Sequence, residues 1–223
     1  MPGRIAQTFA RLRSEGHAGL VTFTTAGDPD LPRSAEILRA LDRAGADVLE
    51  VGVPFSDPLA DGPVIQRATE RALAAGGSLR SALSMIEEIR SGVSAPIVLF
   101  TYANPVFRMG IETFARRAAA AGVDGVLALD LPIEEAGAFR DVLASEGLDT
   151  IFLLSPTTTD ARIRRAAELG RGFLYGISRL GVTGARETVA AAYGERPAPG
   201  GPAPGDPAPG GPAPASAQES ARP

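Results

Sequence analysis

The sequence contains neither cysteine nor lysine, and each absence excludes a kind of chemistry. All 22 basic side chains among the 223 residues are arginine. Without cysteine the chain has no disulfide, no thiolate nucleophile and no cysteine-ligated metal site. Without lysine it cannot form a Schiff base with a carbonyl substrate or hold pyridoxal phosphate covalently.

Histidine and positive charge are also scarce. The only histidine is His17, so we expect no histidine-based triad and no multi-histidine metal site. The formal net charge of −4 argues against a broad basic surface for nucleic acid. No apolar run reaches the roughly 18 residues that span a bilayer, and the first residues do not resemble a signal peptide. We therefore expect a cytoplasmic protein with no nucleic-acid or membrane partner, in which Asp, Glu or Tyr carries any proton transfer.

Short apolar runs alternate with longer segments of helical period from Ala18 to about Tyr175. The expected strands are residues 19–25, 48–53, 96–102, 125–130, 150–155 and 172–178. The expected helices are residues 31–44, 64–75, 79–91, 111–121, 134–145 and 160–169, with a further helix within 182–193. Strands that are apolar almost throughout suit a parallel sheet covered by helices. The sequence therefore predicts the α/β class with about six βα units.

Two α/β architectures fit this alternation, a doubly wound sheet and a (β/α)8 TIM barrel. Polar stretches such as TTAGDPD, FSDPLADGP, TYANP, DLPIEE, SPTTTD and SRLGVTG follow nearly every expected strand. A barrel gathers all its strand ends around one mouth, whereas an open sheet concentrates its site at one switch point. The pattern favours the barrel type.

The composition changes abruptly after Tyr193, where proline, alanine and glycine dominate. Such a segment cannot bury enough apolar surface to offset its ordering entropy. A flexible tail is favoured over a ligand for a proline-binding module. We predict an incomplete (β/α) barrel domain over residues 1–194 and a disordered Pro/Ala/Gly-rich tail over residues 195–223.

The stretch LEVGVPFSDPLADGP, residues 49–63, concentrates the carboxylates Glu50, Asp57 and Asp61 at a strand end and its loop. An ordinary surface loop has no need of an acid inside the preceding strand, but a catalytic site has. Glu50 lies within an apolar strand, where burial raises a carboxyl pKa as an acid catalyst requires. The alternative for Glu50 is a structural acid paired with an arginine.

This stretch closely resembles the signature of the tryptophan synthase alpha subunit family. TFTTAGDPD, AGADVLEVGVPFSDPLADGPVIQRA, TYANPVF, GVDGVLALDLPIEE and GFLYGISRLGVTGA follow in the family's order, so the resemblance covers about residues 4–188. It implies a (β/α)8 barrel that cleaves indole-3-glycerol phosphate to indole and glyceraldehyde 3-phosphate. It implies no metal or organic cofactor in this chain, and a pyridoxal-phosphate beta subunit as partner in an α2β2 tetramer.

The resemblance also implies roles for single residues. Glu50 would be the general acid–base, and Asp61 would accept the hydrogen bond of the indole N–H. Tyr175 would line the active site in a supporting role. Thr183, on the SRLGVTG loop that closes over substrate, would hydrogen-bond Asp61. Phe23 and Phe100 would wall the indole pocket, with barrel core packing as their alternative.

Three further residues, Asp57, Pro54 and Asn104, lie on loops that face the beta subunit in the family. Asp57 has the alternative role of capping a turn.

The sequence departs from the family after the sixth unit. The family has two more strands and helices there, whose loops bind the substrate phosphate, whereas this sequence has the proline-rich tail. We therefore assign no residue to phosphate binding and expect unpaired first and sixth strands. Poor stability or weak activity of the chain alone would follow. The alternative is a catalytically deficient module that binds the beta subunit, while another phosphate-sugar lyase on the same barrel is disfavoured.

Overall fold

The strands of the computed structural model, which describes residues 3–177, are all parallel to their neighbours. They are β1 (Val21–Thr25), β2 (Val48–Gly52), β3 (Ile97–Thr101), β4 (Gly125–Ala128), β5 (Asp149–Thr150), β6 (Phe152–Leu154) and β7 (Leu174–Gly176). The order is β1-β2-β3-β4-β5 in one sheet and β6-β7 in a second. A doubly wound sheet reverses its strand order at a switch point, whereas a barrel adds strands in sequence. The predicted barrel-type α/β fold is confirmed.

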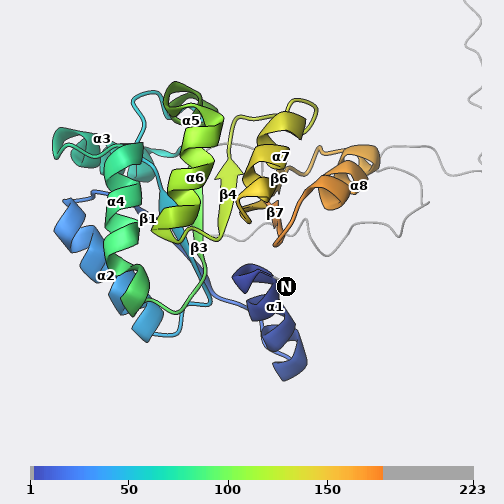
Figure 1. Cartoon of the computed structure of the whole chain (residues 1–223), viewed down its shortest axis with the longest axis horizontal. Helices are drawn as coiled ribbons and strands as arrows, with labels where there is room; N and C mark the ends of the chain where they lie inside the picture. Colours follow the sequence, from blue (N-terminus) through green and yellow to red (C-terminus); the bar gives the residue numbers. More distant parts are fainter. Residues whose placement is uncertain (1–2, 178–223) are drawn as a thin grey trace, which may run out of the picture. The chain divides into compact units, whose positions relative to one another are not determined.

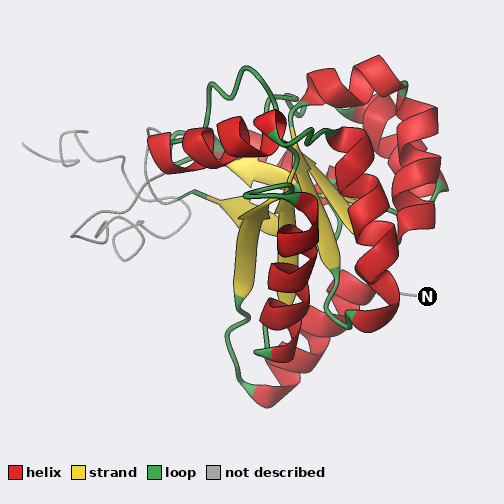
Figure 2. Ribbon diagram, turned by 90° about the vertical axis from the view of Figure 1, so that its left-hand side faces the viewer, coloured by secondary structure: helices red, strands yellow, loops and turns green. Residues whose placement is uncertain are grey.

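Helices surround the strands, which lie together in the middle of the molecule (Figures 1 and 2). They are α1 (Arg4–Glu15), α2 (Leu31–Arg43), α3 (Pro63–Ala74), α4 (Leu79–Ile89), the short 3-10 helix η1 (Arg90–Gly92), α5 (Ala103–Met109), α6 (Ile111–Ala121), α7 (Gly137–Ser145) and α8 (Asp160–Leu169). Along the outer side of the sheet, α2 contacts α4, α4 contacts α6, and α6 contacts α7. Within residues 3–177 no helix is long and apolar enough to cross a membrane.

The two faces of the sheet carry separate apolar clusters, because side chains alternate along a strand. Leu49 and Val51 of β2 belong to the larger cluster, which packs under the helices. Val48 belongs to a smaller inner cluster with four other buried residues, Ile5, Val98, Leu127 and Ile151. Since Glu50 has the same strand parity as Val48, it lies on this inner face.

The structure differs from the prediction at four places. The helices α1 and α5 were not predicted, although Ile5, Phe9 and Leu12 show helical spacing in α1. Pro105 lies in the first turn of α5, where proline is tolerated because the N–H it lacks would have no partner within the helix. The expected strand 150–155 is interrupted at Ile151, where pairing passes from β4 to β7. The expected helix 134–145 begins only at Gly137, after two turns.

Other predictions fall outside residues 3–177. They are the helix within 182–193, the domain boundary at 194/195 and the tail over 195–223, and they stay predictions.

The junctions AGAD (44–47) and AGVD (121–124) hold neighbouring strands together at their N-terminal ends. In each, the aspartate carboxylate accepts a hydrogen bond from the backbone N–H at the beginning of the neighbouring strand. Asp47 accepts from Leu20 and Asp124 accepts from Ile97, both at 2.9 Å. The same four-residue pattern therefore sets the register of two strand pairs.

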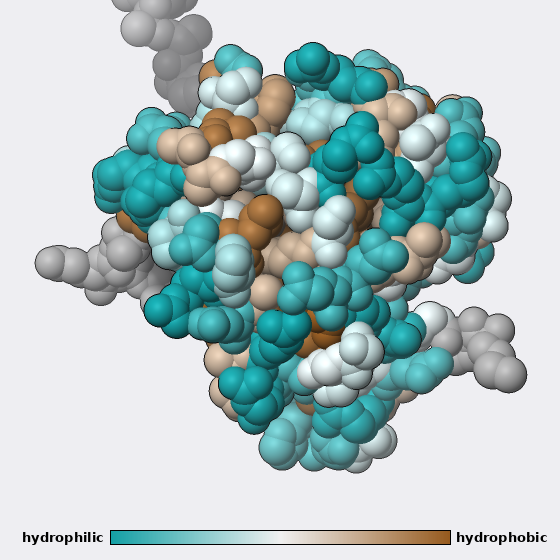
Figure 3. Space-filling model, turned by 60° about the vertical axis from the view of Figure 1, so that its left-hand side comes forward, coloured by the Kyte–Doolittle hydropathy of each residue, from teal (hydrophilic) through white to brown (hydrophobic). Residues whose placement is uncertain are grey.

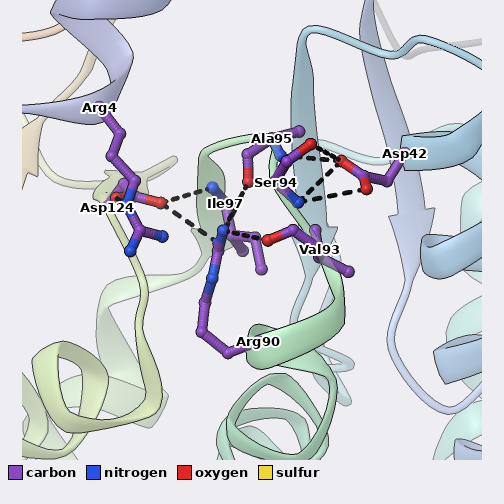
Figure 4. A network of polar contacts seen from close by, with 8 residues as sticks. All are labelled: Arg4, Asp42, Arg90, Val93, Ser94, Ala95, Ile97 and Asp124. Carbon is purple, nitrogen blue, oxygen red and sulfur yellow. Dashed lines mark hydrogen bonds and ion pairs between the residues drawn. The ribbon is translucent and has the colours of Figure 1, made fainter.

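Arg90 and Asp42 extend this network across the same end of the sheet (Figure 4). Arg90 donates to the Ala95 carbonyl at 3.1 Å and pairs with Asp124 at 3.5 Å. Asp42 accepts from the backbone N–H groups of Ser94 and Ala95. Partial burial opposes ionisation of Asp42, but these hydrogen bonds hold its pKa below the usual range. The network ties α2 and β4 to the beginning of β3, which leaves the opposite end of the strands free to carry a site.

Candidate active site

Glu50 lies in the middle of β2 with only 2% of its surface exposed. Its neighbours in the sheet are Phe23 on β1 and Val98 on β3. Among the described residues, its Oε1 atom has no hydrogen-bond partner. The predicted structural alternative, an ion pair with arginine, is therefore absent from residues 3–177.

Burial raises the pKa of Glu50 to about 7. A carboxyl without a compensating partner in an apolar interior is more stable protonated, so its proton is held near neutral pH. A group with this pKa can both give and take a proton under physiological conditions. The expected pKa shift is therefore present.

A small hollow of about 10 Å³, with room for about one water molecule, lies where β1, β2 and β3 end, on the side opposite the Arg90 network. Asp61, Phe23 and Phe100 line it, together with Thr25, Gly52, Val53, Ile65, Thr69 and Tyr102. The rings of Phe23 and Phe100 meet edge to face, with centroids 5.4 Å apart. Two predicted pocket walls and one predicted catalytic carboxylate thus meet at one hollow. Glu50 does not line it but lies one step deeper along the inner face of β2.

The Asp61 carboxyl is held on the loop between β2 and α3. Its Oδ2 atom accepts a hydrogen bond from the Tyr102 hydroxyl at 3.1 Å, and its backbone carbonyl accepts one from the Gln66 side chain at 2.9 Å. Burial raises the pKa of Asp61, while the bond from Tyr102 opposes that rise. The carboxyl is therefore placed to accept a further hydrogen bond from a group in the hollow.

Tyr175 on β7 faces the same inner cluster as Glu50. Its ring centroid is 6.2 Å from that of Phe100. Burial, and after it the charge of Glu50, raises the pKa of Tyr175. Tyr175 therefore lies close enough to Glu50 for the charge of that carboxylate to affect its hydroxyl. Thr183 lies outside the described residues, so its predicted contact with Asp61 stays a prediction.

The predicted partner-facing residues separate into two groups. Asp57 and Asn104 are exposed, whereas Pro54 is buried beside Gly77. Pro54 therefore cannot present its ring to a partner from this position, which corrects the expectation for that residue. The turn after Asp57 is closed by the Leu59 N–H bonding to the Asp57 carbonyl at 2.9 Å.

Because Gly52 has no side chain, the Phe23 ring can lie directly against its backbone. A Cβ atom at position 52 would lie 2.5 Å from Phe23 Cζ, which is closer than real Cβ atoms approach other atoms. Glycine is required here by this close approach of a ring.

Gly52→Ala should therefore displace the Phe23 ring and lower the free energy of unfolding by about 1–3 kcal/mol. Urea titration would measure this loss. Gly137→Ala is the matched control, since a Cβ there meets nothing within 4 Å. Phe23→Leu should recover part of the loss in the Gly52→Ala background. Equal stability of the Gly52 and Gly137 variants would show that the ring is not held in this place.

Tyr102 is the site residue that sequence reasoning did not select. It directly follows β3 in the TYANP stretch, and only 6% of its surface is exposed. A tyrosine directly after a buried strand, beside an acid-bearing loop, was the available signal. Its contact with Asp61 joins residues 41 positions apart, so spacing in the sequence could not find it.

The described residues contain no group of three or more His, Cys, Asp or Glu side chains that could hold a metal ion. The chemistry that the site itself offers is proton transfer by one deeply buried carboxyl and hydrogen-bond acceptance by a second, beside aromatic walls. Fold and site together define a barrel-type enzyme whose buried carboxyl groups suit acid–base chemistry.

Comparisons with known proteins identify the family. The family model of the tryptophan synthase alpha chain matches residues 9–195, and this chain belongs to that family. The chain is 54% identical over 187 residues to the tryptophan synthase alpha chain of Geotalea uraniireducens (strain Rf4), covering 84% of this chain and 70% of the relative. It is 52% identical over 197 residues to that of Burkholderia lata, covering 87% and 73%.

Solved structures agree with this assignment. The chain resembles tryptophan synthase of Mycobacterium tuberculosis with a TM-score of 0.79 and 41% identity, over 83% of this chain and 72% of the other. It resembles a chain of the Pyrococcus furiosus tryptophan synthase a2b2 complex with a TM-score of 0.69 and 44% identity, over 71% and 67%. As a member of this family, the chain is a lyase of tryptophan biosynthesis.

Proposed function

We propose that this chain cleaves indole-3-glycerol phosphate with Glu50 as its general acid–base and Asp61 as the acceptor of the indole N–H hydrogen bond. The observation that carries the proposal is the burial of Glu50, which raises its pKa to about 7 and leaves its Oε1 atom without a hydrogen-bond partner among residues 3–177. An unpaired acid in a core is costly to the fold, so its presence favours a catalytic role.

The reaction breaks the bond between indole C3 and the glycerol chain. Glu50 in its protonated form gives a proton to C3. The Glu50 carboxylate formed in this way then accepts the proton of the side-chain hydroxyl as the bond breaks and that carbon becomes the aldehyde of glyceraldehyde 3-phosphate, which restores protonated Glu50. Positive charge develops at the indole nitrogen before the bond breaks, and the Asp61 carboxylate stabilises it through the N–H. The products are indole and glyceraldehyde 3-phosphate.

Phe23 and Phe100 bind the indole ring in this proposal, with Tyr175 behind them. Their edge-to-face contact at 5.4 Å gives a rigid apolar wall beside Asp61. An indole ring that lies against this wall would present its N–H to the carboxylate. No side chain of this site is assigned to the phosphate.

A beta subunit is the proposed partner, in an α2β2 assembly. Apolar side chains are exposed around the site: Leu59 on the loop before α3 is 89% exposed and Phe107 on α5 is 50% exposed. Asp57 and Asn104 lie on the same two segments. The face that carries α2, α3 and α4 in Figure 1 shows further hydrophobic patches among hydrophilic side chains (Figure 3). Exposed apolar groups beside a site support a protein partner there.

We also propose a cytoplasmic location, as expected of an enzyme of amino-acid biosynthesis.

The test is release of indole from indole-3-glycerol phosphate by the purified chain, with and without added tryptophan synthase beta subunit. We expect indole to form with time above the uncatalysed background, and faster when the beta subunit is present. Binding to the beta subunit would be measured in parallel by analytical ultracentrifugation. If the folded chain binds the beta subunit but releases no indole, the chain is the catalytically deficient binding module and not an active enzyme. Failure of both would contradict the proposed function.

A further inference from the structure

The Tyr102 hydroxyl joins the end of β3 to the loop that carries Asp61. It accepts a hydrogen bond from the Ala60 backbone N–H at 3.0 Å and donates one to Asp61 Oδ2 at 3.1 Å. Both partners come from the loop between β2 and α3, while Tyr102 itself directly follows a buried strand. One hydroxyl group therefore fixes two consecutive loop residues to the rigid sheet.

The ring of Tyr102 is fixed as well. It packs against Phe55, with ring centroids 5.1 Å apart, and it lines the hollow with Asp61. Phe55 belongs to the same loop, so ring and hydroxyl hold that loop at two separate points. A phenol confined in this way keeps its oxygen in one place, and the cost of ordering the loop is met before substrate binds.

The two oxygens of the Asp61 carboxylate differ in their hydrogen bonds. Oδ2 is occupied by the Tyr102 hydroxyl, while Oδ1 has no hydrogen-bond partner among residues 3–177. A donor that approaches through the hollow therefore meets Oδ1. The bond from Tyr102 also sets the direction in which Oδ1 points, because a carboxylate held at one oxygen cannot rotate freely.

We infer that Tyr102 is a positioning residue for the cleavage reaction, which holds the Asp61 carboxylate ionised and turned toward the indole N–H. This inference rests on the proposed function for the role of Asp61. It goes beyond that function because it gives Tyr102, at the end of β3, the role of orienting the Asp61 carboxylate.

The charges around this pair give the direction of a pH effect. Tyr102 donates to Asp61 from the end of β3, and Asp130, after β4, acts on Tyr102 from the other side. Burial, with a smaller contribution from these carboxylates, raises the pKa of Tyr102 to about 12, so the hydroxyl stays a donor at neutral pH. Burial raises the pKa of Asp61 and the Tyr102 bond opposes it. Loss of that bond must raise the pKa of Asp61 further.

The experiment compares Tyr102→Phe with Phe55→Leu in the full chain with its beta subunit. Tyr102→Phe keeps the ring and removes the hydroxyl, and Phe55→Leu removes the ring contact and keeps the hydroxyl. For Tyr102→Phe we expect kcat/KM to fall roughly tenfold near neutral pH, as for loss of a hydrogen bond to a charged group. Its acid limb should move to higher pH, so that the loss shrinks as the pH rises. For Phe55→Leu the acid limb should stay in place.

A second measurement does not depend on turnover. Carboxyl carbon NMR of the chain, with the Asp61 signal assigned by Asp61→Asn, should show Asp61 titrating at higher pH in Tyr102→Phe than in the unaltered chain. An unmoved Asp61 titration would overturn the inference, as would a pH-independent loss of activity of equal size in both variants. If the unaltered chain released no indole, the proposed function would fail, and the titration would still decide whether Tyr102 controls Asp61.

Discussion

Glu50→Gln should lower indole release by about 10²- to 10⁴-fold, the range for loss of a positioned general acid–base. Glutamine has nearly the same shape, so Val98 and Phe23, the neighbours of Glu50 in the sheet, should stay packed, but the amide cannot give a proton to indole C3. The loss should appear in kcat, because the proton is transferred only in the chemical step. Single-turnover measurements of indole release with saturating substrate would isolate this step.

The matched control is Glu87→Gln on α4, which makes the same chemical change at an exposed position. It should leave indole release unchanged. Both variants should bind the beta subunit as the unaltered chain does, because Glu50 is buried and contributes no surface. A Glu50→Gln variant that keeps more than about a tenth of the activity would remove Glu50 from the catalytic role.

The stability of the unaltered chain should fall, relative to that of Glu50→Gln, as the pH rises from about 4 to about 8.5. The folded state holds the Glu50 proton up to a pKa of about 7, against an ordinary value of 4.5. Glu50 therefore contributes stability that is fully present below pH 4.5 and is lost as the pH rises through 7. The difference between the two pKa values corresponds to roughly 3 kcal/mol.

Urea unfolding of both proteins across this range would measure the change in their stability difference. The other carboxyl groups titrate in both proteins, so their contributions cancel, and glutamine has no proton to lose. The difference between the unaltered chain and Glu87→Gln should stay constant over the same range. A stability difference for Glu50→Gln that does not vary with pH would mean that the folded chain solvates Glu50 or pairs it with a cation.

The site was predictable where a residue type and its strand position carry the information locally. An acid inside an apolar strand indicates a buried acid, and Glu50 is buried as expected. Asp61, in a loop rich in glycine and proline after that strand, lies at the strand ends as expected. Phe23 and Phe100 were assigned to the pocket or to the core. Both line the hollow, and Phe100 also packs against the inner cluster.

Contacts between distant segments were not predictable in this way. Tyr102 was passed over because nothing in its own stretch shows that its hydroxyl reaches Asp61. Pro54 was assigned to the partner surface, but packing against the segment at Gly77 buries it. The helix α5 was not predicted either, and its Pro105 lies in the first turn, where the missing N–H would have no partner within the helix.

Hydrophobic periodicity and the polar strand ends were sufficient for the α/β class and the barrel-type winding. The missing residue types led to the prediction that carboxylates carry the proton. These are local properties, set by which side chains a strand or helix buries. The tertiary structure alone decided three features of the site. They are the pKa of Glu50, the hydrogen bond that holds Asp61, and the position of Glu50 deeper along the sheet than Asp61. Burial and hydrogen bonding depend on which neighbours surround a group, and those neighbours come from parts of the chain far apart in sequence.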